Sequence, residues 1–400
     1  MTVAIIVPNY PPTICGVGDY TYLLIQELLK ADLEVHVICS ADQKPEPADK
    51  PFVYPIVEKW NKQGFQTALD KLETIQPDWV MVQYVPHGYD PRGLPIAILR
   101  FYKALTKKAY QVLTMFHEVR VRPGHKLSSR FISAVETYIA HQITRHSKQT
   151  VTSIDFYADL LRGSLTGGTI HILPIGTGIE PIAKNVLIQK ELKERFDMPP
   201  NAPVVVTFGN RDVSEYIGAF DLLQKDYPDL IWLLCGKTST PKAVLDSRPY
   251  FRVTGRLSAE DIYHALSLGD VAFLPEPVNA RMEGGSSNKS TALACVFSLG
   301  VPVIGIKGDM NNALLKHNVN IVLVHVFEED SLYNALKKGL NTEGGQKLGQ
   351  GARHFYDTAL SWDVLGKKFM DLMGIDANFG ELSKLPQPTN ELTNQLKCTT

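Results

Sequence analysis

The chain has no surplus of charge of either sign, and this balance bears on its partners. Its 400 residues include 41 lysines and arginines and 42 acidic residues, which gives a formal net charge of -1. Proteins that bind nucleic acid without sequence preference depend on a large cationic surplus that neutralises phosphates. Nucleic acid is therefore not an expected partner.

Cysteine is scarce as well. The five cysteines are odd in number, far apart in the sequence and mostly placed in apolar stretches: Cys15, Cys39, Cys235, Cys295 and Cys398. This usage favours the reduced thiols of a cytoplasmic protein. No two of them have the CxxC spacing of a zinc site, so no metal is expected.

Long hydrophobic runs are missing. The apolar N-terminal stretch, residues 1–8, contains no lysine or arginine and is far shorter than the roughly 20 residues that a spanning helix needs. It predicts a buried first strand. Any membrane contact is expected to be peripheral.

Apolar residues make up 44% of the chain and aromatic residues 9%, which is ample for two or three packed domains at roughly 150 residues each. Short apolar runs alternate with segments of helical period, a pattern typical of an α/β fold whose parallel strands are covered by helices on both faces. Strands are predicted at residues 3–7, 33–39, 79–83, 112–116, 150–153 and 170–173, and again at 204–208, 230–235, 251–254, 271–274, 301–304 and 320–324.

Two sheets are more plausible than one very wide sheet. The turn-rich stretch 173–181 marks the boundary between them, and a charged helix at 186–196 opens the second unit. We therefore expect domains at 1–182 and 183–360. Residues 376–400 are too poor in apolar side chains to offset their ordering entropy, so a flexible polar tail is expected there.

Ligands of parallel sheets bind beyond the carboxyl ends of the strands. The loop after the first predicted strand carries Gly16 and Gly18 just before a helix, where glycine permits close approach and free amides attract anions or hydroxyl oxygens. Thr21 occupies the third position of the GxGxxG pattern, and the loop is too long for a dinucleotide turn. A dehydrogenase is therefore not favoured.

Two later strands are also followed by residues that could bind a substrate or transfer a proton. His117 follows the strand at 112–116 and could bond a sugar hydroxyl, move a proton, or simply bond a nearby carbonyl. Glu276 follows the strand at 271–274. These positions become informative only together with the loop that comes next.

The loop from Glu283 to Thr291 is the most informative segment. Glycines are followed by Ser286, Ser287, Asn288, Lys289 and Ser290 at a predicted helix start, which supplies amides, hydroxyls and a cation where a diphosphate would dock. A P-loop would need glycine at position 288, so a nucleoside triphosphatase is not expected. The alternative is a serine-capped helix with a solvated lysine.

The order of these motifs resembles family 4 glycosyltransferases of the GT-B fold. The resemblance runs from about residue 3 to about residue 374 and includes the glycine loop, His117, the segments 253–262 and 269–275, and Leu-Gly-Val-Pro at 299–302. It implies two Rossmann-like domains that face a cleft, with a nucleotide sugar on the C-terminal domain and the acceptor mainly on the N-terminal one. The Leu-Ser-Trp-Asp sequence at 360–363 resembles the family's last segment, which implies that residues 361–375 form a helix crossing back to the first domain.

Residue by residue, the resemblance implies that Gly16 and Gly18 face the acceptor and phosphate and that His117 contacts the donor sugar. Gly209 and Arg211 match the strand end that clamps the donor diphosphate, although Arg211 is displaced by about one residue and the family's following lysine is absent. Lys289 is expected to substitute for that lysine.

A larger departure concerns the family's paired glutamates, which have seven residues between them and usually bind the donor sugar and its ribose. Glu283 could be the first, but Thr291 stands eight positions later, and counting back from Gly300 places Cys295 at the position of the second. A hydrogen bond to a charged group contributes ~1.5 to 3 kcal/mol. Loss of the bond that the second glutamate would make to the donor therefore predicts roughly ten- to hundredfold weaker donor binding.

The resemblance implies retention of anomeric configuration without a metal, in agreement with the absence of an Asp-x-Asp pair. The amides and cations would neutralise the diphosphate, and Glu276 or Glu283 would bind sugar hydroxyls. The expected partners are a nucleotide sugar, which is a substrate and not a cofactor, and a hydroxyl-bearing glycan, lipid or small molecule.

Three interpretations stay open. The first is the glycosyltransferase. The second is a degenerate GT-B binding or regulatory protein, and the third is a sugar-nucleotide epimerase or hydrolase on the same scaffold. Separately, cations near residues 120–130 fit either a phosphorylated or lipid-borne acceptor or an ordinary solvated surface, and the surface is favoured.

Overall fold

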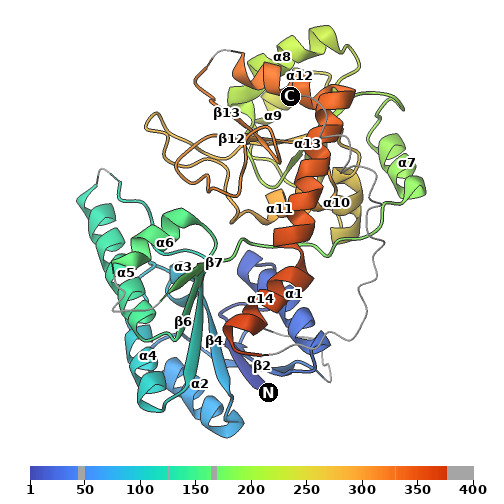
Figure 1. Cartoon of the computed structure of the whole chain (residues 1–400). Coiled ribbons are helices and arrows are strands. Elements are labelled where there is room, and N and C mark those ends of the chain that lie inside the picture. Colours follow the sequence, from blue (N-terminus) through green and yellow to red (C-terminus); the bar gives the residue numbers. More distant parts are fainter. Residues whose placement is uncertain (44–49, 125, 164–168, 329, 376–400) are drawn as a thin grey trace, which may run out of the picture.

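The computed structural model describes residues 1–43, 50–124, 126–163, 169–328 and 330–375. The segment 376–400, for which a flexible tail was expected, lies outside the described residues. Within them the chain forms two parallel β-sheets, each flanked by helices (Figure 1). The predicted α/β class with two Rossmann-like domains is confirmed.

The N-terminal sheet has seven strands in the order β3-β2-β1-β4-β5-β6-β7, and every pairing is parallel. The strands are β1 (Thr2–Ile6), β2 (Glu34–Ser40), β3 (Phe52–Val57), β4 (Trp79–Tyr84), β5 (Gln111–Phe116), β6 (Gln149–Thr152) and β7 (Ile170–Ile172). Only β3 was missed by the sequence prediction. It is a half-buried edge strand interrupted by Pro55, and proline within a run weakens a strand pattern.

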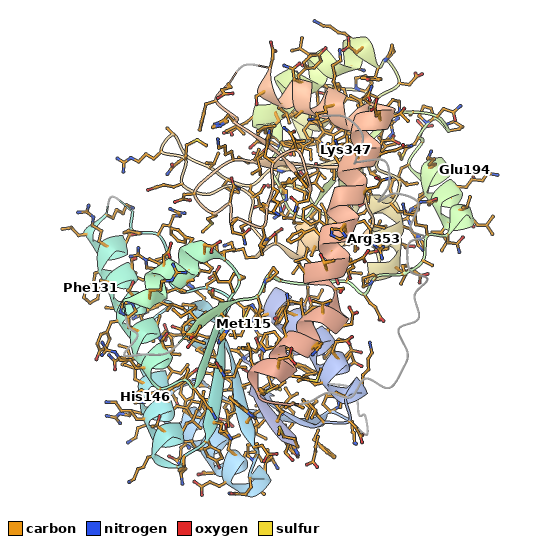
Figure 2. All side chains as sticks on the ribbon, in the orientation of Figure 1. Met115, Phe131, His146, Glu194, Lys347 and Arg353 are labelled. Atoms are coloured by element: carbon orange, nitrogen blue, oxygen red, sulfur yellow. The ribbon has the colours of Figure 1, made fainter. Side chains whose placement is uncertain are left out.

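Helices cover both faces of this sheet. On one face α1 (Gly16–Lys30) and α14 (Trp362–Leu372) share a core with Met115 of β5 (Figure 2). On the other face lie α2 (Lys62–Ile75), α4 (Ile98–Lys107), α5 (Leu127–Arg145) and α6 (Asp155–Arg162), with the short α3 (Pro86–Tyr89) beside them. None of the helices in the described ranges is long and apolar enough to cross a bilayer.

The C-terminal sheet has six parallel strands in the order β10-β9-β8-β11-β12-β13. They are β8 (Val204–Phe208), β9 (Ile231–Cys235), β10 (Phe251–Gly255), β11 (Val271–Leu274), β12 (Val303–Ile306) and β13 (Val322–Val324). The strand predicted at 301–304 begins two residues late because Gly300, with a φ of 66°, ends the preceding helix and Pro302 cannot donate to the ladder.

The helices of the second domain are α7 (Val186–Arg195), α8 (Ile217–Asp226), α9 (Lys242–Asp246), α10 (Ala259–Leu266), α11 (Thr291–Ser298), α12 (Ser331–Leu340) and α13 (Thr342–Phe355). Short single turns precede α8 (Ser214–Tyr216) and follow α13 (Tyr356–Leu360). Because both sheets are parallel, the loops after β1, β5, β8, β11 and β12 gather at strand carboxyl ends.

The last helix returns to the first domain. The indole Nε1 of Trp362 donates to the Thr177 carbonyl at 3.2 Å and to its hydroxyl at 3.0 Å, and the ring lies edge-on against Tyr20 with centroids 5.0 Å apart. The helix therefore packs on α1 and is hydrogen-bonded to Thr177 in the segment that connects the domains. The limits expected at residues 182 and 360 stay predictions.

Gly366 allows the closest approach of α14 to α1. A Cβ at this position would lie 2.5 Å from the Cβ of Glu27, so Gly366→Ala should force the helices apart. Overpacking of this kind costs ~1–3 kcal/mol, which exceeds the gain in helix propensity of about 1 kcal/mol. We expect a lower melting temperature by differential scanning calorimetry. Gly218→Ala on α8, where a Cβ meets nothing within 4 Å, is the matched control and should not lower it.

Candidate functional site

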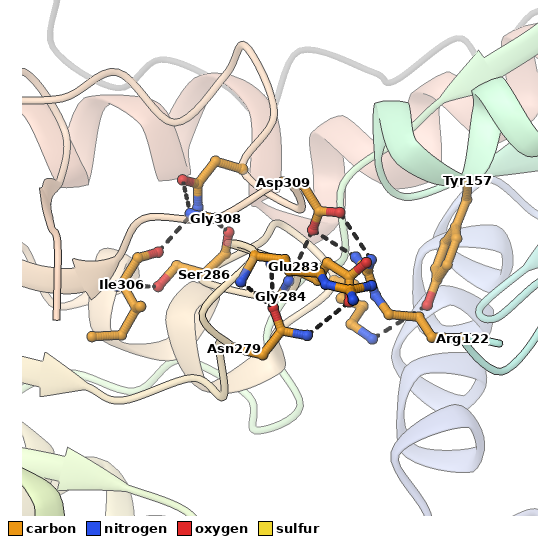
Figure 3. Close-up of polar contacts among 12 residues, drawn as sticks. Arg122, Tyr157, Asn279, Glu283, Gly284, Ser286, Ile306, Gly308 and Asp309 are labelled. Atoms are coloured by element: carbon orange, nitrogen blue, oxygen red, sulfur yellow. Dashed lines mark hydrogen bonds and ion pairs between the residues drawn. The ribbon is translucent and has the colours of Figure 1, made fainter. Parts of the chain in front are cut away.

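An ion pair joins the two domains. The Arg122 guanidinium, in the loop after β5, donates two hydrogen bonds to the carboxylate of Asp309, in the loop after β12, at 2.9 and 2.6 Å. Both side chains are about one-third exposed, at 32% and 38%. The guanidinium also lies 4.5 Å from the ring centre of Phe156 on α6. The strand-end loops of the two sheets are therefore in direct contact (Figure 3).

We call this contact between the loops after β5 and β12 the domain junction. Asp309 connects it to the glycine loop of the second domain. Its Oδ1 also accepts a hydrogen bond from the Gly284 amide at 2.8 Å. Gly284 has a φ of 119°, and a Cβ there would lie 2.1 Å from the Pro277 carbonyl oxygen, so only glycine fits. The neighbouring Glu283 carboxylate accepts from the Asn279 amide at 2.7 Å (Figure 3). The loop is thus fixed by backbone geometry before any ligand binds.

The next three residues of the loop are buried. The Ser286 hydroxyl accepts a hydrogen bond from the Ile306 amide at 2.9 Å, so it already has a partner within the protein. Ser287 is 3% exposed. The Asn288 side chain donates to Asn312 at 2.8 Å, yet its own Oδ1 is buried without a hydrogen-bond partner. These side chains therefore shape the loop, and its accessible side chains are those of Glu283 before them and Lys289 after them.

Lys289 lies at the start of α11 and reaches the other domain. Its ammonium group is 3.3 Å from the hydroxyl of Tyr157 on α6 and 5.6 Å from the ring centre. The Ser290 hydroxyl accepts from the Leu293 amide at 3.3 Å and caps the helix, and Thr291 begins it. The serine cap considered as the alternative is present, but the lysine points to a domain junction instead of bulk solvent.

His117 lies in the N-terminal part of the junction. Its Nε2 is 2.7 Å from Oε1 of Gln83, because Gln83 lies on β4 next to β5, the strand that His117 follows. Its ring is edge-on to that of Tyr20, with the ring centroids 4.9 Å apart. Burial lowers the pKa of His117 from 6.5 to about 3. The imidazole is therefore neutral at pH 7. Because Oε1 can only accept, Nε2 carries the proton and Nδ1 is left as an acceptor for a hydroxyl.

Arg211 and Glu276 meet at the ends of β8 and β11. The guanidinium donates to the Pro275 carbonyl at 2.6 Å and to the Glu276 carboxylate at 2.8 Å, and both side chains are largely buried. Gly209, with a φ of 97°, makes the turn that leads to Arg211. Gly209 and Arg211 therefore follow the end of β8, and the Arg211 guanidinium is already paired with a carboxylate.

A cavity of about 360 Å³ opens beside this pair. It is lined by Asn210, Arg211, Asp212, Glu215, Tyr216, Ser239, Pro275, Glu276 and Pro277. Three of its side chains are acidic and one is cationic, so its chemistry suits hydroxyl groups better than phosphates. Lys289 does not line it. The two cations expected to clamp one diphosphate thus lie beside different parts of the site.

The loop for which an acceptor role was predicted leads into the start of α1. The residue before the helix, Cys15, provides no side-chain cap, so the first amides are left for another partner. A Cβ at Gly18 would lie 2.8 Å from the Asn9 carbonyl oxygen, whereas a Cβ at Gly16 would meet nothing within 4 Å. Gly18 is therefore needed for packing, and Gly16 leaves open space at the helix terminus.

The two positions considered for the missing second glutamate, Thr291 and Cys295, are both covered by another part of the chain. Cys295 is fully buried on α11, and burial raises the pKa of its thiol to about 11 although the backbone amides of Gly178 and Ile179 face the sulfur and favour the thiolate. A Cβ at Gly178 would also lie 3.2 Å from Thr291. The segment that connects the domains thus covers the positions at which a ribose carboxylate was sought.

The structure brings the predicted residues together in two groups. Glu283, Ser286, Ser287, Asn288, Lys289, Ser290 and Thr291 form one loop at the domain junction, and Gly209, Arg211 and Glu276 line the second sheet's edge. In the first domain, His117 directly follows β5, and Gly16 and Gly18 lie in the first turn of α1. Sequence reasoning missed Asp309, whose only signal was that it follows an apolar strand. In the described ranges no three His, Cys, Asp or Glu side chains form a cluster that could hold a metal.

The interdomain ion pair is testable by charge reversal. Asp309→Arg places two cations together, so we expect the domains to separate and the radius of gyration from small-angle X-ray scattering to rise. The swap of both charges, Arg122→Asp with Asp309→Arg, should reverse most of this change. Reversal of Asp221, which pairs with Arg248 inside one domain, is the control. Equal radii in all variants would contradict the assignment.

The pKa of His117 gives a pH prediction. Its folded-state pKa of about 3 lies below the ordinary 6.5, so unfolding takes up a proton between these values and stability falls as the pH drops through that window. His117→Asn should therefore lose less stability than the native protein between pH 7 and pH 4, as measured by urea unfolding. His354→Asn, on the exposed side of α13, should behave like the native protein.

Proteins of known structure are similar to this chain over nearly its whole length. No protein-family profile and no curated protein sequence matches the chain, but solved structures do. Sucrose-phosphate synthase from Thermosynechococcus elongatus is 14% identical, with a TM-score of 0.64 over 93% of this chain and 98% of its own. HepE of Anabaena in complex with UDP is 13% identical, with a TM-score of 0.63 over 94% of this chain and all (100%) of its own.

An epimerase is similar too. UDP-GlcNAc 2-epimerase from Neisseria meningitidis bound to UDP-GlcNAc is 13% identical, with a TM-score of 0.57 over 93% of this chain and 99% of its own. Identities this low carry information about architecture and not about activity. The two parallel-sheet domains of this chain have the GT-B fold of its glycosyltransferase neighbours.

Proposed function

We propose that this protein is a family 4-like glycosyltransferase of cytoplasmic location that moves a sugar from a nucleotide-sugar donor to a hydroxyl acceptor. The observation that carries the proposal is the loop from Glu283 to Thr291. It places a lysine and a helix start at the junction between two GT-B domains. HepE of Anabaena, a protein of the same fold, has been solved with UDP, with UDP and glucose, and with UDP-glucose.

Departure of the nucleoside diphosphate requires neutralisation of its developing charge. The Lys289 ammonium and the first amides of α11 would supply that neutralisation, because cations and helix N-termini both stabilise phosphate oxygens. Arg211 is the second candidate, and a diphosphate would have to compete with Glu276 for it. This arrangement needs no metal, and we propose a metal-independent transfer.

The sugar would lie between the two domains. The neutral His117 can accept a hydroxyl hydrogen at Nδ1, and the Glu283 carboxylate, held by Asn279, can accept another. Glu276 would do the same beside the cavity. These groups bind and orient the sugar, and no carboxylate is assigned as a nucleophile. Retention of anomeric configuration is part of the proposal.

The acceptor would approach from the first domain. The uncapped amides at the start of α1 and the open space beside Gly16 can receive a hydroxyl-bearing glycan, lipid or small molecule. Occupation of this site next to the donor would raise the effective concentration of the hydroxyl at the reacting carbon.

A sugar-nucleotide epimerase or hydrolase is the second candidate, because the fold also occurs in an epimerase that was solved with UDP-GlcNAc. A binding or regulatory protein without transfer activity is the third. Its support is the absence of a ribose carboxylate at Thr291 and Cys295, which are covered by the connecting segment.

A binding panel followed by a turnover assay separates these functions. Melting temperatures are measured with nucleoside diphosphates and nucleotide sugars, and release of free diphosphate is then measured with and without a set of hydroxyl acceptors. Release that depends on an acceptor supports the transferase. Conversion of the sugar nucleotide without any acceptor would indicate the epimerase or hydrolase, and binding without turnover would indicate the regulatory protein.

Lys289→Ala tests the diphosphate site directly. Loss of a charge-assisted hydrogen bond of ~1.5 to 3 kcal/mol should weaken UDP binding roughly ten- to hundredfold in isothermal titration calorimetry. Stability should change little because the side chain is only partly buried. Lys347→Ala on α13 is the control, with unchanged affinity expected. An unaltered affinity in Lys289→Ala would remove this residue from the site.

A further inference from the structure

The charge of the chain is unevenly distributed. Between Asp90 and Asp155 there are eleven lysines and arginines and two acidic residues, although the chain as a whole has a net charge of -1. One of the two acids, Glu136, is fully buried and accepts from the Val121 amide at 2.7 Å. The balanced total therefore conceals a strongly cationic segment, which comprises α4, β5 and α5 together with their connecting loops.

Helix α5 presents large apolar side chains to solvent within this segment. Leu127 is 81% exposed, Phe131 65% and Tyr138 57%. Their spacing of four and seven residues puts them on one stripe of the helix, opposite the stripe that packs on the sheet. Figure 2 shows Phe131 at the outer edge of the molecule. An exposed apolar stripe of this kind marks an interaction surface.

Exposed cations flank this stripe. Arg130 is exposed beside Phe131, and Arg100, Lys103 and Lys107 form the exposed side of α4. Helix α4 packs between α2 and α5 in the layer that covers one face of the sheet, so its solvent side and that of α5 belong to the same outer surface. The acidic Glu73 of α2 is paired with Lys108 at the margin of this surface.

We propose that the outer surface of α4 and α5 docks on an anionic phospholipid bilayer. The three apolar side chains of α5 would enter the headgroup boundary, and the surrounding lysines and arginines would contact lipid phosphates, which is the division of labour of an interfacial amphipathic helix. A soluble polyanion would use the cations but would leave the apolar stripe in water. The combination of the two therefore points to a bilayer.

The docked surface lies next to the domain junction along the chain. Leu127 follows Arg122 by only five residues, and Arg122 pairs with Asp309 of the other domain. Docking would thus bring the membrane beside the loop after β5, which also carries His117. The inference itself rests on the surface of the first domain and not on the proposed transfer activity, and the experiment below does not involve turnover.

Vesicle cosedimentation of the full chain tests the inference. We expect binding to vesicles of phosphatidylcholine mixed with an equal amount of phosphatidylglycerol, and little binding to phosphatidylcholine alone. The double variant Lys103→Ser, Arg130→Ser should weaken binding roughly twenty- to thirtyfold, because each cation near an anionic surface contributes about 1 kcal/mol. Lys184→Ser with Lys347→Ser removes two cations from other surfaces and should leave binding unchanged.

The apolar stripe is tested separately. Phe131→Ser with Tyr138→Ser should weaken binding to the mixed vesicles by at least about tenfold, whereas Val186→Ser with Leu187→Ser on α7, where the side chains are 75% and 72% exposed, should not. Melting temperatures should be unchanged because all of these side chains are exposed. Absence of vesicle binding would overturn the proposal. Loss of binding only in the cation variant would overturn it too, in favour of a soluble polyanionic partner.

Discussion

Every strand in both sheets runs parallel to its neighbours, and the rest of the structure depends on that constraint. Parallel strands deliver all their carboxyl ends to one edge, and each following helix begins at the same edge with its amides exposed. In this chain the edges of the two sheets approach each other. The loops after β5 and β12 meet through Arg122 and Asp309, and the start of α11 reaches α6 through Lys289.

The junction is a connected network in which a single carboxylate serves both domains. Asp309 accepts from the guanidinium of one domain and from the Gly284 amide of the other, so the position of the glycine loop depends on the contact between domains. A nucleotide bound at this loop would therefore respond to interdomain geometry. A second connection is made by α14, which packs on α1 and whose Trp362 donates to Thr177 of the connecting segment.

The site combines buried groups that fix shape with accessible groups that can bind. Ser286 and Asn288 belong to the first kind, since their polar atoms face Ile306 and Asn312. Lys289 and Glu283 belong to the second. The acidic cavity beside Arg211 and the cationic helix start at Lys289 differ in charge, and this separation fits a ligand with hydroxyl groups at one end and phosphates at the other.

The sequence by itself determined the fold class and the positions of most strands along the chain, because apolar runs such as 204–208 and 271–274 must be buried on both faces and a parallel sheet with helices on both sides does so. It missed β3, whose exposed edge position gives a weak pattern. It also predicted a ligand-binding loop at 283–291 from glycine and serine chemistry, and that role stays a prediction. Only the tertiary structure decided which groups are accessible and which are paired. Arg211 meets Glu276 across 65 residues and Arg122 meets Asp309 across 187, and contacts at such separations follow from the packing of sheets and not from local pattern.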